Sequence, residues 1–465
     1  MEKDSMGTFE VPADAYYGAN TMRAKRNFPI STLRLQRPFL RALGLIKQQS
    51  AEVNRELGLL EAGLAQAIVD AAQEVVDGTL DDQFIVDVFQ TGSGTSTNMN
   101  ANEVISNRAI EMLGGEIGSR TPVHPNDHVN AGQSSNDVIP TAIQMAAAVE
   151  IHDALLPALD ALEASLRDKS NELWPVVKTG RTHLQDATPI RLGQEFLGYA
   201  GQIERARRRC GEAVATLVEL PLGGTAVGTG VGTHEKFASR VIARIADTTG
   251  LPFRETDNHF SGQSTLDAVV AAGGALRAVA VALYAVANNI RLLGFGPRAG
   301  VAEIAIPAVQ PGSSIMPGKV NPVINESVTM VAAQVIGNDA TIAFCGAAGS
   351  LLELNVMMPV AAYDLLESIA ILAAASRNFA TQAIDGITAT DNGPAMVERG
   401  LMTCTALAPR IGYDAAAAIA KEAFASGRTV REVARERTDL TEDELTSLLD
   451  PEAMTKPGRG LPAGG

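Results

Sequence analysis

The feature that most constrains the fold is a set of long apolar stripes with helical spacing in the middle of the chain. From Leu192 to Leu220, apolar residues recur at alternating steps of four and three, which is typical of a heptad stripe. A second stripe runs from Leu266 to Ile290 and contains small residues that permit close packing between helices. The ranges 138–173, 320–344 and 352–379 are also rich in alanine and leucine and predict further helices. Five helices of roughly 25–30 residues would each be about 40–45 Å long.

Helices of this length bury their stripes against one another. The expected fold is therefore mainly all-α, an elongated antiparallel long-helix bundle with smaller N- and C-terminal domains. Aromatic residues make up only 4% of the chain, which fits a core packed by alanine and leucine. We interpret the stripes as core or subunit interface and give them no catalytic meaning.

The two ends of the chain differ from this middle region. Residues 1–132 combine a possible short strand at Thr8–Val11 with shorter helices and polar loops, which predicts a mixed, mostly helical N-terminal domain. Residues 133–391 would form the bundle. Residues 392–465 predict a small helical C-terminal domain, in which Thr441 and Glu444 form a capping-box pattern. The tail from Lys456 is expected to be disordered.

Charge and cysteine content exclude several classes of function. The net charge is −15 with no long basic run, which argues against nucleic acid or an anionic membrane as partner. Three scattered cysteines without a CxxC motif predict reduced thiols. The first residues lack an apolar signal core, and the longest apolar run, Ala278–Ala287, is shorter than the roughly 20 residues that span a bilayer. We therefore expect a cytoplasmic protein.

Four polar loops each precede an expected helix. They read TGSGTSTN at 91–98, QSSND at 133–137, GRTHLQDATP at 180–189 and PGSSIMPGKVNP at 311–322. Free N–H groups at helix N-termini can bind anions, although each loop taken alone could be an ordinary cap. The loops hold more hydroxyls and amides than capping needs, and Lys319 opposes the helix dipole. This surplus favours a site for a small anion.

The loop at 311–322 is not a phosphate-binding P-loop. Five residues separate Gly312 from Gly318, and Val320 stands where a serine or threonine would hold Mg²⁺. We expect Asn321 to cap the following helix, with Pro322 at its first position. Ser313 has no histidine nearby in the sequence, so a serine-hydrolase function has little support.

Two further patterns have plain structural interpretations. His124 and His128 have the i, i+4 spacing of metal ligands, but Pro125 and the turn at 130–132 argue against a helix there. The glycines at 223–232 neither follow a clear strand nor open a clear helix. A tight structural loop is favoured there over a dinucleotide site.

Taken together, the motifs resemble those of the fumarase/aspartase superfamily. PGSSIMPGKVNP is similar to its signature loop, and the resemblance extends along nearly the whole chain. The other segments that resemble class II fumarate hydratases are TGSGTSTNMNANEV, HPNDHVN, QSSNDV, GRTHLQDATP, GGTAVGTG and IGNDATI. Ser93, Ser135 and Gly224 follow the fumarase pattern, whereas residues 11–24 look more like an aspartase. The sequence departs from the common fumarase pattern at Gly232, Phe295 and residues 260–262.

The resemblance implies reversible anti addition of water to fumarate, giving (S)-malate, without a metal or other cofactor. It also implies a homotetramer whose active sites are built from three subunits. An aspartate ammonia-lyase is the alternative enzyme. A non-catalytic helical protein like the lens crystallins of this superfamily is a third possibility.

The same resemblance assigns roles to individual residues. Ser313 would be the base that removes a proton from carbon, His183 the proton-transfer histidine and Glu326 its charge partner. Residues implied to contact the substrate are Ser93, Thr95, Ser134, Ser135, Asn136, Thr182, Ser314, Lys319 and Asn321. A second anion site would comprise His124, Asn126 and Asp127. Because a serine hydroxyl is a weak base at pH 7, backbone N–H groups between Ser314 and Gly318 are expected to stabilise its alkoxide.

Overall fold

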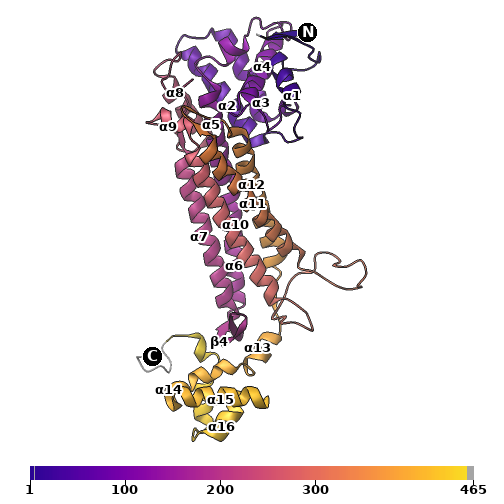
Figure 1. The fold of residues 1–465 in the computed structure, drawn as a ribbon, viewed down its shortest axis with the longest axis vertical. Coiled ribbons are helices and arrows are strands. Elements are labelled where there is room, and N and C mark those ends of the chain that lie inside the picture. The colour runs from indigo at the N-terminus through magenta and orange to yellow at the C-terminus, as the bar shows by residue number, and fades with distance from the viewer. Residues whose placement is uncertain (5, 458–465) are drawn as a thin grey trace. The chain divides into compact units, whose positions relative to one another are not determined.

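The protein is described by a computed structural model that covers residues 1–4 and 6–457. Most of the predicted disordered tail, residues 458–465, lies outside the described residues. Helices dominate the chain (Figure 1), and the mainly helical fold class is confirmed. The chain divides into two compact units. The first comprises Met1–Pro157, Ala206–Ala280 and Val331–Ala373, and the second comprises Ala158–Arg205, Val281–Met330 and the residues from Ala374 onward. The domain boundaries at 132 and 391 stay predictions.

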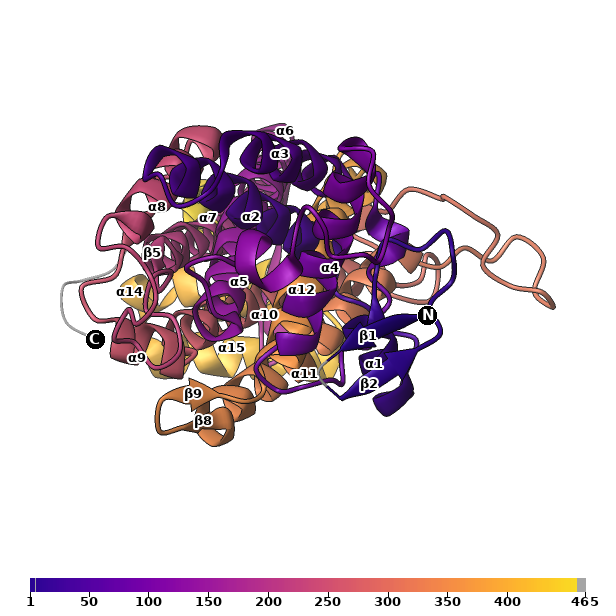
Figure 2. The same ribbon diagram turned by 90° about the horizontal axis from the view of Figure 1, so that it is seen from above.

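In the first unit, helix α2 (Arg37–Glu56) is the central element and contacts α3, α5 and α8 (Figure 2). Its apolar face is buried, and so is the polar run from Lys47 to Ser50. The other short elements of this unit are β1 Glu2–Asp4, β2 Gly7–Phe9, α1 Ala19–Asn27, α3 Ala62–Asp77, η1 Asp81–Gln83, α4 Thr95–Met112, η2 Pro125–Val129, β5 Glu219–Leu220, α8 Phe237–Thr249, β6 Arg254–Glu255, α9 His259–Ser264, β8 Ser350–Leu351 and β9 Leu354–Asn355.

The second unit contains the C-terminal helices and one longer hairpin. The hairpin pairs β3 (Val177–Thr182) with β4 (Gln185–Arg191), and α13 packs against β3. The remaining short elements are β7 Ile304–Ala305, η4 Ala380–Ile384, β10 Thr388–Ala389, α13 Asn392–Val397, η5 Leu401–Ala406, α14 Ala408–Ile411, α15 Tyr413–Ser426, α16 Val430–Arg437, α17 Glu442–Leu448 and η6 Ala453–Thr455. Thr441 caps α17 in the predicted capping box with Glu444.

The predicted long helices are present and contribute residues to both units. They are α7 Leu192–Leu217, α10 Asp267–Leu293, α11 Val323–Gly349, α12 Met358–Phe379 and a continuous helical run made of α5 Ser135–Glu150, the π-helical segment η3 Ile151–Leu155 and α6 Leu156–Glu172. A side chain added at Gly273 of α10 would contact Ile342 of α11, and Asn325 of α11 donates to the Ala287 carbonyl of α10. As the residue number rises on one helix it falls on the other, so this pair is antiparallel as predicted.

Some predicted boundaries are wrong. The helix expected from Leu352 begins at Met358, because residues 350–355 form the β8–β9 hairpin. The helix expected from about Ala101 begins at Thr95, and the strand expected at Thr8–Val11 is β2, at Gly7–Phe9. These differences lie at element ends, where local propensity is weakest.

Four helical runs are long and apolar enough to cross a membrane by length and composition alone. They are Ser135–Glu172, Asp267–Leu293, Val323–Gly349 and Met358–Ile384. The sequence argument considered only uninterrupted apolar residues and therefore did not single them out. In all four runs, part of the most apolar window is buried inside the protein, from 39% to 61%.

Candidate active site

Hydroxyl groups from two predicted loops meet in the first unit. The Thr95 Oγ1 atom lies 2.7 Å from Ser93 Oγ and 2.7 Å from Ser135 Oγ. Thr95 opens α4 and Ser135 opens α5, so the fold brings residues 40 positions apart to one place. Ser93 and Ser135 are both buried. Each hydroxyl can donate or accept, which suits a site that binds carboxylate oxygens.

The loop before α5 is held by a buried carboxylate. Ser134 is the N-cap of α5, and its backbone N–H donates to Asp137 Oδ1 at 2.9 Å. The other oxygen of Asp137 accepts the N–H groups of Gly223 and Thr225 at 2.9 and 3.0 Å. The glycine loop at 223–232 is thereby fixed beside the loop that precedes α5. Within it, the Ala226 carbonyl accepts the side-chain N–H of Asn136 at 2.8 Å, which orients that amide.

A buried lysine supports the same loop from α2. Lys47 Nζ donates to Asn130 Oδ1 at 2.9 Å and to Gln133 Oε1 at 3.0 Å. Burial lowers the pKa of Lys47 to about 7, and burial raises the pKa of Asp137. The attraction between the ammonium of Lys47 and the carboxylate of Asp137 opposes both of these pKa shifts. Sequence reasoning missed Lys47, because a lysine in an amphipathic helix is usually exposed. Its only signal was the unusually polar run around it.

The loop with Thr182 and His183 does not open a helix, so that expectation is wrong. It is the β3–β4 hairpin, with His183 and Leu184 at the two turn positions. Their φ angles of 56° and 60° are both left-handed, as in a type I′ turn. Neither residue is glycine or asparagine, and such conformations cost on the order of 1–3 kcal/mol each. Thr182 and His183 are exposed at this tip.

The Ser313 loop is closed by its own hydrogen bonds. Ser313 Oγ accepts the N–H groups of Ile315 at 3.2 Å and Met316 at 2.8 Å. Both donors fall within the range expected to stabilise an alkoxide there. The loop ends meet where the Gly312 N–H donates to the Lys319 carbonyl at 2.8 Å. A side chain at Gly312 would lie 2.6 Å from that carbonyl oxygen, so this glycine is needed for the close approach.

Asn321 does not cap the next helix with its side chain, contrary to the sequence expectation. Its amide N–H donates to the Gly312 carbonyl at 2.7 Å, and its oxygen accepts from Lys319 Nζ. The helix α11 begins two residues later, at Val323. Ser314 is exposed in the same loop. Glu326 lies in the first turn of α11, and among the described residues no interaction joins it to His183.

The expectation of no helix near His124 and His128 is wrong, because Pro125–Val129 forms a short π-helical turn. Asn126 and Asp127 lie in this turn, and His124 is its N-cap. His124 Nδ1 accepts the Asp127 N–H at 3.2 Å, and His128 Nδ1 accepts the His124 N–H at 2.9 Å. Within residues 1–4 and 6–457, no three His, Cys, Asp or Glu side chains form a metal-ligand cluster. Asn126 and Asp127 are exposed.

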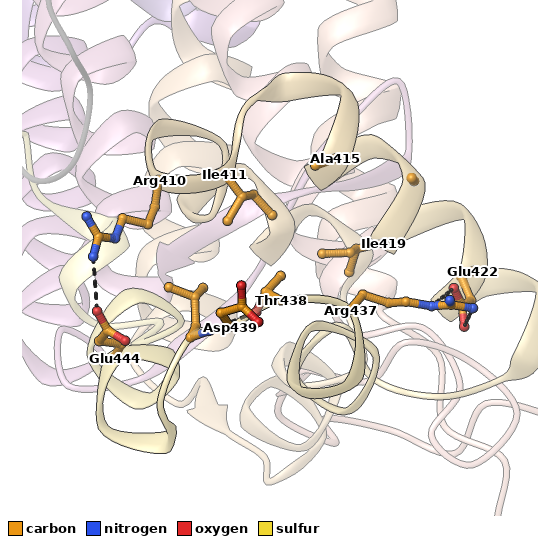
Figure 3. A pocket seen from close by; sticks show the side chains of 11 residues that line it. Arg410, Ile411, Ala415, Ile419, Glu422, Arg437, Thr438, Asp439 and Glu444 are labelled. Carbon is orange, nitrogen blue, oxygen red and sulfur yellow. Dashed lines mark hydrogen bonds and ion pairs between the residues drawn. The ribbon is translucent and has the colours of Figure 1, made fainter.

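A pocket of about 730 Å³ lies elsewhere in the second unit, among the C-terminal helices (Figure 3). Ile411 and Ile419 contribute apolar surface, and the ion pairs Arg410–Glu444 and Arg437–Glu422 flank it. Its lining includes none of the predicted site residues.

Comparison with known proteins gives the family. Residues 7–337 match the family model described as "Lyase", and residues 404–456 match that of the "Fumarase C C-terminus". The chain is 52% identical over 98% of its length to "Fumarate hydratase class II 2" of Bradyrhizobium diazoefficiens, 97% of which is covered. It is 54% identical over 98% of its length to "Fumarate hydratase class II" of Halobacterium salinarum, again with 97% covered. The chain belongs to the class II fumarate hydratase family.

Solved structures agree with this family. A class II fumarase from Schistosoma mansoni is similar at 37% identity with a TM-score of 0.96, covering 98% of this chain and 99% of that one. A Brucella melitensis structure titled fumarate lyase:delta crystallin is similar at 45% identity with a TM-score of 0.94 and the same coverage. The resemblance found in the sequence is confirmed, as is the assignment to the lyases. Membership of the class II fumarate hydratase family implies a small dicarboxylate as substrate.

One position that follows the class II fumarate hydratase pattern, Gly224, has a clear steric cause. A Cβ atom at Gly224 would lie 2.2 Å from Gln263 Oε1 and 3.1 Å from His259 Cβ. Gln263 is fully buried and donates to the Thr225 carbonyl at 3.3 Å, so it has little freedom to move aside. Glycine at this position therefore lets the 223–226 loop pack against α9.

Replacing Gly224 by alanine is expected to lower the free energy of unfolding by about 1–3 kcal/mol, because it overpacks this contact. Urea unfolding would measure the loss. Gly211→Ala is the matched control, since a Cβ at Gly211 of α7 meets nothing within 4 Å. Adding Gln263→Ala should restore part of the loss. If Gly224→Ala proved as stable as the control, the contact with Gln263 would not be the reason for glycine.

Proposed function

We propose that the protein hydrates fumarate to (S)-malate and catalyses the reverse reaction at a site formed by the four predicted loops. The observation that carries this proposal is the full-length similarity to proteins named fumarate hydratase class II, combined with the pattern of donors in the loops. Ser93, Thr95 and Ser135 form one hydroxyl cluster, and Ser313 Oγ accepts two backbone N–H groups. Donors of this kind suit a substrate with two carboxylates.

In the direction from malate, Ser313 would take the proton from the carbon beside a carboxylate. The new negative charge spreads onto that carboxylate, and preorganised donors stabilise such charge strongly. Lys319 and Asn321 are the donors that we assign to it. The N–H groups of Ile315 and Met316 would hold the Ser313 oxygen as an alkoxide before the transfer. These two hydrogen bonds support this role, because both donors already point at Oγ.

The hydroxyl on the neighbouring carbon would leave as water after taking a proton from His183. The carbon–oxygen bond breaks as the carbon–carbon double bond forms. One proton has then moved to Ser313, and one has left His183. Return of the proton from serine through solvent to histidine completes the cycle. Glu326 is proposed as the charge partner that favours the protonated imidazole. His124, Asn126 and Asp127 are proposed as a second anion site.

We further propose a cytoplasmic homotetramer with sites shared between subunits. Large apolar side chains on two of the long helices support an assembly. Val281 and Tyr284 of α10 and Met330, Ile336 and Phe344 of α11 are all exposed in the single chain. A group of large apolar side chains exposed on neighbouring helices often marks a surface that another protein covers. Packing of further copies would cover them without a membrane.

The substrate can be tested directly by following the ultraviolet absorbance of fumarate. Addition of (S)-malate to the purified protein should produce fumarate, and addition of L-aspartate should produce almost none. (R)-malate is the matched control for a chiral site and should remain unchanged. Rapid deamination of aspartate with inert malate would establish the alternative, an aspartate ammonia-lyase. Inactivity on both would favour the non-catalytic helical protein.

A further inference from the structure

Four charged side chains form a cluster at the hairpin that carries His183. Lys178 and Arg181 come from strand β3, and Glu195 and Glu303 come from outside the hairpin. Lys178 Nζ lies 2.8 Å from Glu195 Oε1 and 3.0 Å from Glu303 Oε2. Arg181 Nη1 donates to Glu303 Oε1 at 2.8 Å. The side chains of Glu303 and Lys178 are 0% and 1% exposed. Two cations and two carboxylates therefore balance in a cluster whose central pair, Lys178 and Glu303, is fully buried, whereas Arg181 and Glu195 are partly exposed.

Within this cluster, the backbone of Glu303 is held by two hydrogen bonds. Its backbone N–H donates to the Leu293 carbonyl at 2.8 Å, and its carbonyl accepts the Thr390 N–H at 3.0 Å. It stands directly before β7, which pairs with β10. A Cβ at Gly393 of α13 would contact both Lys178 and Glu303, so α13 covers the cluster. Burial raises the pKa of Glu195, whose carboxylate shares Lys178 with Glu303.

The hairpin needs an anchor near its tip. Its ladder shifts register between Thr179, which pairs with Pro189, and Arg181, which pairs with Asp186, so β4 has one residue more than β3 across this step. A Cβ at Gly180 would lie 2.5 Å from the Thr188 carbonyl, so the two strands approach closely there. Beyond this register shift the only paired residues are Arg181 with Asp186 and Thr182 with Gln185. The tip then carries two left-handed residues, a conformation that persists only where the surroundings enforce it.

Resting on the function proposed above, we infer that Glu303 is a positioning residue that holds the His183 hairpin through Arg181 and Lys178. Arg181 is the first paired residue beyond the register shift and precedes His183 by two positions. Its ion pair with Glu303 therefore restrains the part of the hairpin that the ladder holds least. Neither Glu303 nor Arg181 is assigned a contact with substrate. Their effect on the reaction would pass through the placement of the imidazole.

The test uses Arg181→Gln in the full-length enzyme, because this change leaves Glu303 paired with Lys178. We expect kcat for malate to fall about 10–100-fold, the size of effect that a misplacement of about 1 Å produces. KM should change less than kcat, since the cluster of Ser93, Thr95 and Ser135 is untouched and Thr182 is the only proposed substrate contact, besides His183 itself, that moves with the hairpin. Glu303→Gln should lower kcat at least as much. Glu303→Asp, which keeps the charge on a shorter side chain, should recover part of the activity.

The matched control is Arg277→Gln, which removes an ion pair of 2.6 Å with the buried carboxylate of Asp339 in the first unit. It should leave kcat unchanged. Thermal unfolding and the size of the assembly would be measured for every variant. If Glu303→Gln fails to fold, Arg181→Gln carries the test alone.

A double-mutant cycle separates positioning from a general loss of structure. In a His183→Asn background, adding Arg181→Gln should lower kcat less than about twofold further, because both changes act on one group. Losses that multiply would overturn the inference, as would an unchanged kcat in Arg181→Gln. Wild-type enzyme that is inert on malate would instead contradict the proposed function, so the two failures can be told apart.

Discussion

Replacing Ser313 by alanine is expected to lower kcat for malate by about 10²–10⁴-fold, the usual contribution of a positioned base. KM should change little, because Lys319 and Asn321, the proposed hydrogen-bond donors to the substrate carboxylate, remain in place. The physical reason is the hydrogen bonding of Ser313 Oγ, which accepts the Ile315 and Met316 N–H groups. Alanine removes the oxygen that these two donors would hold as an alkoxide. Steady-state kinetics with malate and with fumarate would measure the loss in both directions.

Ser426→Ala is the matched control for this prediction. Ser426 also carries a hydroxyl within hydrogen-bond reach of backbone groups, donating to the Glu422 carbonyl at 2.7 Å in the C-terminal helices. Its loss should leave kcat unchanged. A fall of only a few-fold in Ser313→Ala would move the base to another residue. A large rise in KM with normal kcat would make Ser313 a binding residue instead.

The long helices could be predicted because their apolar periodicity extends over many residues. The alternating steps of three and four from Leu192 predict a helix, and α7 spans Leu192–Leu217. The stripe was predicted to continue to Leu220, which is wrong, because Glu219–Leu220 is the strand β5. The capping box of Thr441 and Glu444 could also be predicted, since N-cap residues act locally. Signals of this kind depend on neighbours within one or two turns.

The β3–β4 hairpin could not be predicted for a physical reason. Two-residue hairpin turns normally carry asparagine or glycine at their left-handed positions, but here they carry His183 and Leu184. The usual turn signal is absent, and the polar sequence around it suggested a loop before a helix. The expectation that Asn321 caps the following helix was wrong for a similar reason, because its side-chain amide donates to the Gly312 carbonyl instead. In both cases a tertiary contact or strain overrides the local preference, as is common at functional sites.

The burial of charged side chains could not be predicted from the sequence for another reason. The sequence does not identify Lys47, Asp137 and Glu303 as buried, since burial depends on partners that come from distant parts of the chain. Asp137 is held by N–H groups 86 and 88 residues away. Glu303 pairs with Arg181, 122 residues earlier. Sequence spacing alone cannot indicate such pairs.

The proposed sharing of active sites between subunits leads to the second large prediction. Asn136 is the second residue of a helical run that continues to Glu172, and His183 lies in the hairpin after that run. The run has 38 residues. At 1.5 Å per residue, a helix of this length would measure about 57 Å. Unless the linker from Trp174 to Pro189 folds back along the run, both side chains can contact one small dicarboxylate only if different subunits supply them.

Mixing two inactive variants tests this sharing. Asn136→Ala and His183→Asn would each be purified, dissociated mildly, combined and reassembled. Random mixing in a symmetric tetramer should leave about a quarter of the sites with neither lesion, so malate activity should return to about that fraction of wild type. Each variant reassembled with itself is the control and should stay inactive. If one chain supplied both residues to the same site, every site would keep a lesion, and well-formed mixed tetramers would stay inactive. A fully active monomer would contradict the sharing equally, because one chain would then hold a complete site.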